Sequence, residues 1–243
     1  MNATTSWLCP PRTIVVAVDF GDASARALAI AGVMASAFDA SVRAVHAERF
    51  EPPPYFTLEQ IGRLQAERRS AQRHAGAHVA EFAARAGGGA VTPIVIDEPP
   101  VDAILDVASD ADLIVLGTHG RRGPGRWWLG SVAERVVRAA SVPVLVTRSV
   151  GTPPAAVFER IALVHEGPDG GMGRFYAQTL TRIAGGVVSD GGTAPTCATD
   201  VVQQATLVVV ARVTAPSSWA LTDPAARVLS SCEAPVLFVP GSI

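Results

Sequence analysis

A glycine-rich stretch between an apolar run and a helix-forming run constrains this chain more than any other feature. Residues 116–131 read Leu-Gly-Thr-His-Gly-Arg-Arg-Gly-Pro-Gly-Arg-Trp-Trp-Leu-Gly-Ser, with the apolar run 113–116 before the glycines and the run 132–140 after them. This order predicts strand, loop and helix. A helix start leaves backbone N–H groups unpaired and carries partial positive charge, and glycines let a backbone approach an anion closely. The stretch therefore predicts a phosphate site.

The chain contains no lysine, because all 20 of its Lys-plus-Arg positions are arginine. A P-loop ATPase needs its Walker lysine, a protein kinase its strand lysine, and a Schiff-base enzyme its amine. The sequence therefore excludes these three classes of protein. A net charge of −2 gives no indication of nucleic acid or an anionic membrane as a partner.

Cysteine usage and hydropathy predict a cytoplasmic protein. Cys9, Cys197 and Cys232 are far apart and form no C-x-x-C pair, which favours reduced, inert thiols. Residues 1–12 have neither the basic start nor the long apolar region of a signal peptide. No apolar run approaches the roughly 20 residues needed to span a bilayer, so we expect no membrane partner.

Strand and helix patterns alternate through the first half of the chain. Continuous β-branched runs predict strands buried on both faces, and apolar residues at helical spacing predict helices. The expected strands are 13–18, 41–46, 91–96, 113–116 and 143–146, and the expected helices are 23–38, about 57–86, 101–108 and 132–140. This alternation predicts an α/β fold: an open parallel five-stranded sheet, order 3-2-1-4-5, with helices on both faces.

The second half repeats the first in shortened form. The linker-like residues 151–154 separate an expected complete domain, 1–150, from an expected reduced domain, 151–243. Residues 221–239 align with 129–147 without a gap, and buried-strand runs recur at 160–164 and 205–210. The long helix has no counterpart, and the glycine-rich residues 183–196 predict only a weak strand near 187–188.

The expected strand order brings two features together. In an open parallel sheet, ligands bind at the carboxyl ends of the strands where the strand order reverses. With the order 3-2-1-4-5, that crevice lies between the first and fourth strands. Asp19 follows the first strand and Gly117 the fourth, so we expect both in one crevice.

The glycine spacing Gly117-x2-Gly120-x9-Gly130-Ser131 resembles the nucleotide loop of the universal stress protein family. The run Val-Ala-Val-Asp at 16–19, the later serine at position 24 and the closing run 143–146 are also similar to that family. The resemblance covers about residues 12–148 as a full domain and 159–240 as a reduced one. It identifies the chain as a tandem member with a degenerate second domain.

The resemblance implies an adenine nucleotide: ATP, with ADP or AMP as alternatives, and with or without Mg²⁺. Carried over by position, Asp19 would contact adenine, Ala17 would lie beside it, and Ala47 would form part of the base or ribose pocket. The remaining implied contacts, to the ribose and phosphates, are Leu116, Gly117, Thr118, Gly120, Gly130, Ser131 and Val132. Arg121, with Arg122 and Arg126, would add charge-assisted contacts in place of the absent lysine.

The second copy predicts a lost site. Residues 222–224, Thr-Asp-Pro, replace the Gly-Ser-Val of residues 130–132. The aspartate places a carboxylate where the anion would lie, and the proline removes an N–H donor. We therefore expect one nucleotide per chain, with the N–H groups of Gly130 and Ser131 exposed to it.

Plainer interpretations stand beside these. Ser131 and Glu134 match the S-x-x-E capping box, which accounts for both residues without a ligand. Asp19 is also a common turn residue after a strand. His74 and His78 have the spacing of a metal-binding pair, but no H-E-x-x-H glutamate or third ligand accompanies them, which favours a solvated helix face.

The sequence supplies no committed general base, nucleophile or metal cluster. His119 is most simply loop scaffolding, and Trp127 and Trp128 are packing residues or a lid. We therefore expect an ATP-binding regulatory or signalling protein of the stress response. The alternatives are a weak ATP-hydrolysing or nucleotidyl-transferring enzyme and an interaction module that binds no nucleotide.

Assembly is expected to follow from the last strand of each half. Residues 143–146 and 235–239 are apolar terminal strands, and exposed apolar edges seek partners. In the family that the chain resembles, such strands pair across a two-fold axis. We expect the two halves to pair in this way within one chain, with a homodimer as the alternative.

Overall fold

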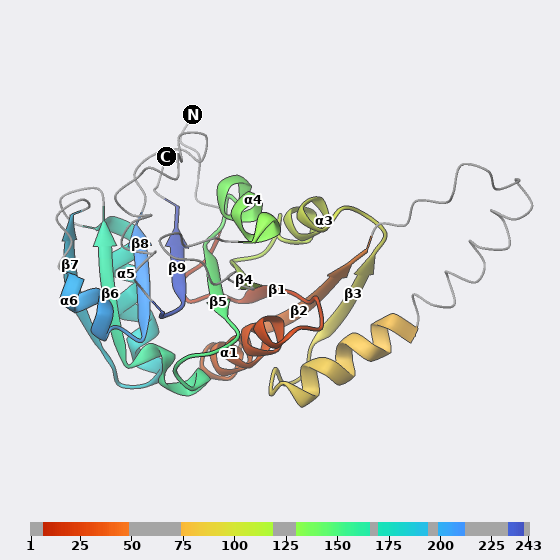
Figure 1. The fold of residues 1–243 in the computed structure, drawn as a ribbon, viewed down its shortest axis with the longest axis horizontal. Helices are drawn as coiled ribbons and strands as arrows, with labels where there is room; N and C mark the ends of the chain where they lie inside the picture. Colours follow the sequence, from red (N-terminus) through yellow and green to blue (C-terminus); the bar gives the residue numbers. More distant parts are fainter. Residues whose placement is uncertain are drawn as a thin grey trace, which may run out of the picture.

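A single mixed sheet runs through the whole molecule (Figure 1). The computed structural model describes residues 7–48, 74–118, 130–165, 170–193, 199–211 and 233–240. In these residues the sheet has nine strands in the order β3-β2-β1-β4-β5-β9-β8-β6-β7. The halves of the chain therefore share one sheet.

The first half forms the parallel sheet that its β-branched runs predict. Its strands are β1 (Thr13–Ala17), β2 (Ser41–Ala47), β3 (Thr92–Ile96), β4 (Leu113–Thr118) and β5 (Val144–Arg148). Every neighbouring pair among them is parallel, and the order is β3-β2-β1-β4-β5. The expected order 3-2-1-4-5 is confirmed. The reversal of strand order lies between β1 and β4.

Helices cover both faces of this half. One face carries α1 (Asp22–Phe38) and the helix of residues 74–85, and the other carries α3 (Pro100–Val107) and α4 (Ser131–Ala139) (Figure 1). The small side chains of Ala23, Ala27 and Ala31 are fully buried, which lets α1 approach the strands closely. Within the described ranges, no helix has both the length and the apolar character needed to cross a membrane.

The second half repeats this topology with fewer elements. Its strands are β6 (Arg160–His165), β7 (Val187–Thr193), β8 (Leu207–Ala211) and β9 (Val236–Val239). Its helices are η1 (Pro154–Phe158), α5 (Gly171–Leu180), η2 (Thr181–Ile183) and α6 (Thr199–Gln204). The order β7-β6-β8-β9 matches β2-β1-β4-β5, and α5 follows β6 as α1 follows β1.

Strand β7 is longer than the sequence predicts. We expected a weak strand near 187–188, whereas β7 continues to Thr193 and contains Asp190 and two glycines. Its register with β6 shifts between Leu163 and Val164, where the extra residue is accommodated. As the last strand of the sheet, β7 has one partner and need not be apolar. A search for apolar runs therefore underestimates it.

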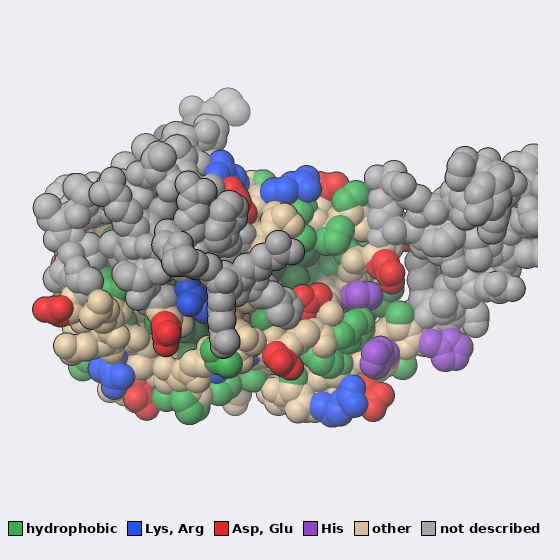
Figure 2. Space-filling view, in the orientation of Figure 1, with side chains coloured by type: hydrophobic (Ala, Val, Ile, Leu, Met, Phe, Trp, Pro, Cys, Tyr) green, Lys and Arg blue, Asp and Glu red, His purple; other side chains and the backbone are tan. Residues whose placement is uncertain are grey.

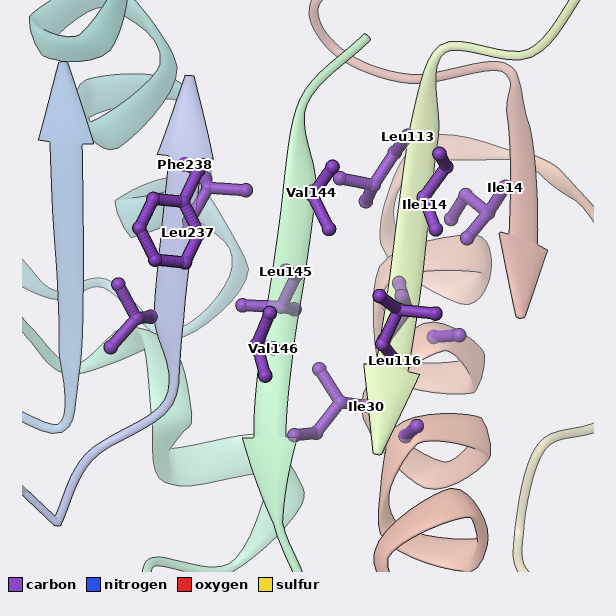
Figure 3. Packing of buried hydrophobic residues seen from close by; sticks show 14 of the residues in the cluster. Ile14, Ile30, Leu113, Ile114, Leu116, Val144, Leu145, Val146, Leu237 and Phe238 are labelled. Carbon is purple, nitrogen blue, oxygen red and sulfur yellow. The ribbon is translucent and has the colours of Figure 1, made fainter. Parts of the chain in front are cut away.

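The two halves join through their terminal strands. Strands β5 and β9 are antiparallel, with Val144 opposite Phe238 and Val146 opposite Val236. Figure 3 shows the side chains of these strands within one continuous hydrophobic layer. Each fully buried side chain of this size contributes about 1.5–3 kcal/mol. The expected pairing of terminal strands within one chain is confirmed.

An N-terminal segment also connects the halves. The carboxylate of Asp112 accepts the backbone N–H groups of Leu8, Arg12 and Thr13 at 2.7, 2.8 and 2.9 Å. The segment places the Trp7 ring 5.9 Å from that of Tyr176 in α5. Asp112 therefore anchors a segment that starts in the first half and packs on the second.

Cys9 lies in this same segment. Burial raises the pKa of its thiol to about 11, against smaller opposing effects of a hydrogen bond with Thr179 and the charge of Arg182. A thiol with a raised pKa is a poor nucleophile near neutral pH. This environment agrees with the expectation that Cys9 is inert.

Candidate functional site

A cavity of about 170 Å³ opens where the strand order reverses. It lies at the carboxyl ends of β1, β2 and β4 and beside the starts of α3 and α4. Six residues predicted from the sequence line it: Ala17, Asp19, Ala47, Leu116, Gly117 and Val132. In the space-filling view, hydrophobic side chains form the floor of a hollow with acidic and histidine side chains near its edge (Figure 2). The arrangement offers an apolar slot with a polar rim.

Seven further residues line the cavity that were not among the predicted contacts: Val18, Ser24, Val45, His46, Pro100, Ile104 and Ala133. All of them lie at the carboxyl end of a strand or in the first turns of a helix. Topology alone could have found Val18 and Val45, since they neighbour predicted residues on β1 and β2. Pro100 and Ile104 could not be predicted from topology, because the packing of α3 beside α4 brings them to the cavity.

Asp19 occupies a tight turn directly after β1. Its Oδ1 accepts the N–H of Gly21 at 2.9 Å, spanning Phe20, whose φ of 62° lies in the left-handed region. A bulky residue rarely adopts this conformation. Asp19 is thus both the turn residue and a residue of the cavity lining. The sequence offered two interpretations of Asp19, a turn residue and a residue of the ligand site, and the two are compatible.

Three rings pack against Phe20, the residue with this unusual conformation. Its ring stacks on His78 at 4.5 Å, and lies 4.7 Å from His46 and 5.3 Å from Phe82. His46 donates from Nδ1 to the carbonyl of Val18 at 2.8 Å. His74 and His78 are both exposed, as expected for a solvated helix face, and one side of the His78 ring also packs on Phe20. Among the described residues, no group of three or more His, Cys, Asp or Glu side chains is placed to hold a metal ion.

Gly117 lies where β4 touches the start of α1. A Cβ at Gly117 would lie 2.4–2.6 Å from backbone atoms of Ala23 and Ser24. Glycine is therefore required here by the packing of strand against helix. We attributed this glycine to approach by a phosphate, and the packing supplies a sufficient reason of its own.

The start of α4 differs in two respects from expectation. Gly130 is the N-cap: its carbonyl accepts the N–H of Glu134 at 2.9 Å, and Ser131 is the first helical residue. The Glu134 carboxylate accepts from Arg138 at 2.8 Å and no side chain caps the helix, so the expected capping box is wrong. We expected the Gly130 N–H to be exposed to an anion. It instead donates to Oγ1 of Thr118 at 3.0 Å, so that expectation is wrong.

Part of the predicted loop lies outside the described residues. This applies to Gly120 and Arg121 of the predicted contacts, and to His119, Arg122, Arg126, Trp127 and Trp128. It also applies to residues 222–224 of the second copy. The described part of the candidate site is therefore the cavity, the end of β4 and the start of α4.

The corresponding region of the second half is packed differently. Ala211 of β8 stands at the position of Gly117, and Gly173 of α5 stands at the position of Ser24. A Cβ at Gly173 would lie 2.4 Å from the Cβ of Ala211. The glycine has moved from the strand to the helix, and the close contact between the two elements is kept.

An ionic cluster occupies the outer part of the second half. Nε2 of His165 lies 3.2 Å from Oδ1 of Asp190, and Arg174 donates to Oδ2 at 2.5 Å. The pKa of Asp190 is lowered to about 2, mainly by the hydrogen bond from Arg174. Smaller contributions come from the N–H of Gly192 and from the hydrogen bond with His165. In the first half, this face is covered by the helix of residues 74–85. We attribute the charged cluster to the lack of a covering helix in the described second half.

Comparison with known proteins agrees with this architecture. The model of the universal stress protein family matches residues 11–148. A universal stress protein of Thermus aquaticus is 36% identical over 139 residues, which cover 56% of this chain and 98% of that protein. One from Methanocaldococcus jannaschii is 32% identical over 139 residues, covering 56% of this chain and 82% of that protein.

Similarity in fold extends over nearly the whole chain. The crystal structure of a universal stress protein from Archaeoglobus fulgidus superimposes with a TM-score of 0.70. The match covers 94% of this chain and 98% of that one at 15% identity, so it concerns the fold alone. The family model covers more than half of the chain, and its limits enclose the entire cavity. This chain belongs to the universal stress protein family.

Proposed function

We propose that the cavity at the end of β1 and β4 binds an adenine nucleotide. The observation that carries the proposal is the place of the cavity: it lies at the reversal of strand order and beside the start of α4. Ligands of open parallel sheets bind at such points, and anions bind at helix starts. ATP is the proposed nucleotide, with ADP and AMP as alternatives.

The donor set of the cavity fits such a ligand. Aliphatic side chains, among them Ile104, Leu116 and Val132, provide walls for a flat base. The N–H groups of Ser131 and Val132 belong to the first turn of α4, where the helix itself supplies no acceptor. One end of the site thus suits the base and the other suits phosphate, which Mg²⁺ would accompany if ATP is bound with its metal.

The polar side chains of the described lining favour binding over catalysis. Ser24 donates to the carbonyl of Gly21 at 2.9 Å, and His46 donates to that of Val18. Asp19 accepts from the N–H of Gly21. These side chains are engaged with the backbone rather than arranged as a nucleophile with its base. We therefore propose a regulatory, cytoplasmic role in the stress response, in which nucleotide occupancy is the signal.

We propose one nucleotide per chain. The region from 1 to 150 would act as the nucleotide-binding domain, and the region from 151 to 243 as a reduced domain that pairs with it. The contact of Gly173 with Ala211 and the cluster around Asp190 support this division, because they replace the features of the first cavity. Dimers of the whole chain are a further proposal, which light scattering of the purified protein would test.

The test is the nucleotide content of the protein purified without added ligand. Nucleotide released on denaturation is identified by mass spectrometry, for the wild type and for Gly130→Glu. A carboxylate at the start of α4 should abolish binding of phosphate. Gly76→Glu is the matched control, because a Cβ at Gly76 meets nothing within 4 Å. We expect nucleotide from wild type and Gly76→Glu only, and equal recovery from all three proteins would contradict the proposal.

A further inference from the structure

The N-terminal segment of residues 7–12, the strap, is attached to the two halves by contacts of different kinds. On the first half, the carboxylate of Asp112 accepts three backbone N–H groups, and hydrogen bonds to an ionised acceptor are stronger than neutral ones. On the second half, the strap packs the ring of Trp7, which is 6% exposed, against Tyr176 of α5. The strap is therefore anchored by hydrogen bonds on one half and packed on the other.

The hydroxyl of Tyr176 has no hydrogen-bond partner at this second contact. Tyr176 is 0% exposed, and among the described residues no group donates to its oxygen or accepts its hydrogen. Burial, followed by the charges of Cys9 and Asp112, raises the pKa of Tyr176 well above its usual range. These two groups belong to the strap and to its anchor, so the phenol faces the strap. A buried donor without an acceptor loses the hydrogen bond that it would make with water. The closed strap therefore carries a cost that an open strap would not.

The second half fixes its own entry segment without this cost. Thr206 precedes β8 as Asp112 precedes β4, and their backbone N–H groups donate to the matching carbonyls of Arg160 and Thr13. The Thr206 hydroxyl accepts the Arg160 N–H at 2.9 Å and donates to the carbonyl of Val157 at 2.9 Å. This entry segment is held within its own half by a partnered hydroxyl. The strap differs because it crosses to the other half and covers an unpartnered one.

We infer that the strap is a latch that opens from the second half while both halves stay folded. Residues 7–11 leave α5, the N–H groups of Arg12 and Thr13 stay on Asp112, and water reaches the Tyr176 hydroxyl. The hydrogen bond regained in this way keeps the closed latch weak, so the strap is a releasable bridge between the halves. The latch is separate from the proposed nucleotide site, because neither the strap nor Tyr176 lines the cavity.

Amide hydrogen exchange, followed by NMR in the full-length protein, measures how often each segment opens. The Leu8 N–H, bonded to Asp112, reports on the latch, and the Thr13 N–H reports on the anchor. The Val208 N–H, bonded to the carbonyl of Pro235, reports on the second half. In the wild type, Leu8 should exchange at least about tenfold faster than Thr13 and Val208, because the latch opens without unfolding either half. Exchange of Leu8 as slow as that of Val208 would overturn the inference.

Tyr176→Phe tests the cause of the weak closure. Phenylalanine keeps the ring against Trp7 and removes the hydroxyl, so no unpaired donor is buried when the latch closes. Leu8 should then exchange at least about fivefold more slowly than in the wild type, which is the lower bound for an unpaired buried donor. Val208 should slow as well, because the closed state is also stabilised against global unfolding. Unchanged exchange of Leu8, whatever Val208 does, would overturn the inference.

Thr206→Val is the matched control, because it also removes a buried hydroxyl, but one that has partners. It should speed the exchange of the Arg160 N–H, which loses its acceptor. Leu8 should exchange within about twofold of the wild type, since the partners of Thr206 lie before β6 and not in the strap. If Leu8 changes in Thr206→Val as much as in Tyr176→Phe, the unpartnered hydroxyl has no special role and the inference is wrong.

The thiol of Cys9 gives a second readout of the same opening. Burial in the closed strap raises its pKa to about 11, whereas a solvated thiol has a pKa of about 8.5 and reacts as the thiolate. Modification of Cys9 by N-ethylmaleimide, measured by mass spectrometry of its peptide, should be at least about fivefold slower in Tyr176→Phe than in the wild type. It should be faster in Trp7→Ala, which loses the ring contact. Equal rates in the three proteins would overturn the inference.

Discussion

Gly117 of β4 packs so closely on Ser24 of α1 that a Cβ on Gly117 would lie 2.5 Å from the Ser24 nitrogen. The opposing atoms are backbone, so they cannot move aside as the end of a side chain can. Gly117→Ala should therefore force the helix away from the strand and lower the free energy of unfolding by about 1–3 kcal/mol, as overpacked cores do. Urea unfolding of the two proteins measures this difference.

Gly76→Ala is the control for this substitution. Gly76 lies in the helix of residues 74–85, and an added Cβ meets nothing within 4 Å. Alanine in a helix is better than glycine by roughly 0.5–1 kcal/mol, so this variant should be slightly more stable than the wild type. If Gly117→Ala unfolds at the same urea concentration as the wild type, the close contact does not determine the residue at this position.

In the second half, we expect a second substitution to restore the stability that the first substitution removes. A Cβ at Gly173 would lie 2.4 Å from the Cβ of Ala211, so the main obstacle there is one methyl group. Gly173→Ala should destabilise the protein, and adding Ala211→Gly should recover much of the loss because that methyl group is removed. The two single variants and the double variant form a thermodynamic cycle. A coupling energy near zero in thermal unfolding would contradict this contact.

The lowered pKa of Asp190 should make the free energy of unfolding depend on pH in the acid range. Its hydrogen bond from Arg174, followed by those from Gly192 and His165, lowers the pKa from 3.8 to about 2 in the folded protein. The unfolded chain then binds the proton first, so the stabilisation is complete above pH 3.8 and is lost as the pH falls towards 2. Asp190→Asn should remove this part of the pH dependence and destabilise the protein above that range.

Arg174→Gln is the matched variant, because it removes the main cause of the lowered pKa and keeps the carboxylate. The difference in unfolding free energy between wild type and Arg174→Gln should shrink as the pH falls from 3.8 towards 2. Asp190 is half exposed, so the magnitude is small and the slope is the informative quantity. A difference that stays constant over this range would exclude the ion pair as its source.

Much of the fold was predictable because burial on both faces leaves a simple pattern. The β-branched run at 13–18 and the apolar run at 113–116 are typical of central strands, and alternation with helices then gives a parallel sheet. The strand β7 and the helix α6 were missed or underestimated for the opposite reason. They lie at the outer edge of the sheet, where polar residues and glycines such as Asp190 and Gly192 are tolerated.

The candidate site was predictable only as far as topology determines it. The positions of Asp19 and Leu116 follow from strand order, because Asp19 lies just after β1 and Leu116 near the carboxyl end of β4, where the order reverses. The engagement of the Gly130 N–H by Thr118 depends on one side-chain contact between residues 12 positions apart. The sequence pattern does not reveal that contact. It also does not reveal the close packing of Gly117 on α1 that requires a glycine there.

Phe20 offers a test of backbone strain beside the cavity. Its φ of 62° costs an L-residue about 1–2 kcal/mol, and its contacts with His46, His78 and Phe82 oppose that cost by about 0.5–1.5 kcal/mol for each aromatic pair. Phe20→Ala loses the contacts and keeps the strain, whereas Phe20→Gly loses the contacts and relieves it. Both variants should be less stable than the wild type, with alanine the worse by about 1 kcal/mol.

Asp39 serves as the reference for the backbone part of this prediction. It is exposed, ends α1 with a φ of 54°, and has no ring to lose. Asp39→Gly should be more stable than Asp39→Ala by a similar amount of about 1 kcal/mol, because glycine adopts the left-handed region without penalty. Chemical unfolding of the four variants gives both differences. The alanine and glycine variants at position 20 could differ much less in unfolding free energy than those at position 39. That result would mean that the turn after β1 relaxes once the Phe20 ring is removed. The contacts of Phe20 would then be the cause of the strained conformation beside Asp19.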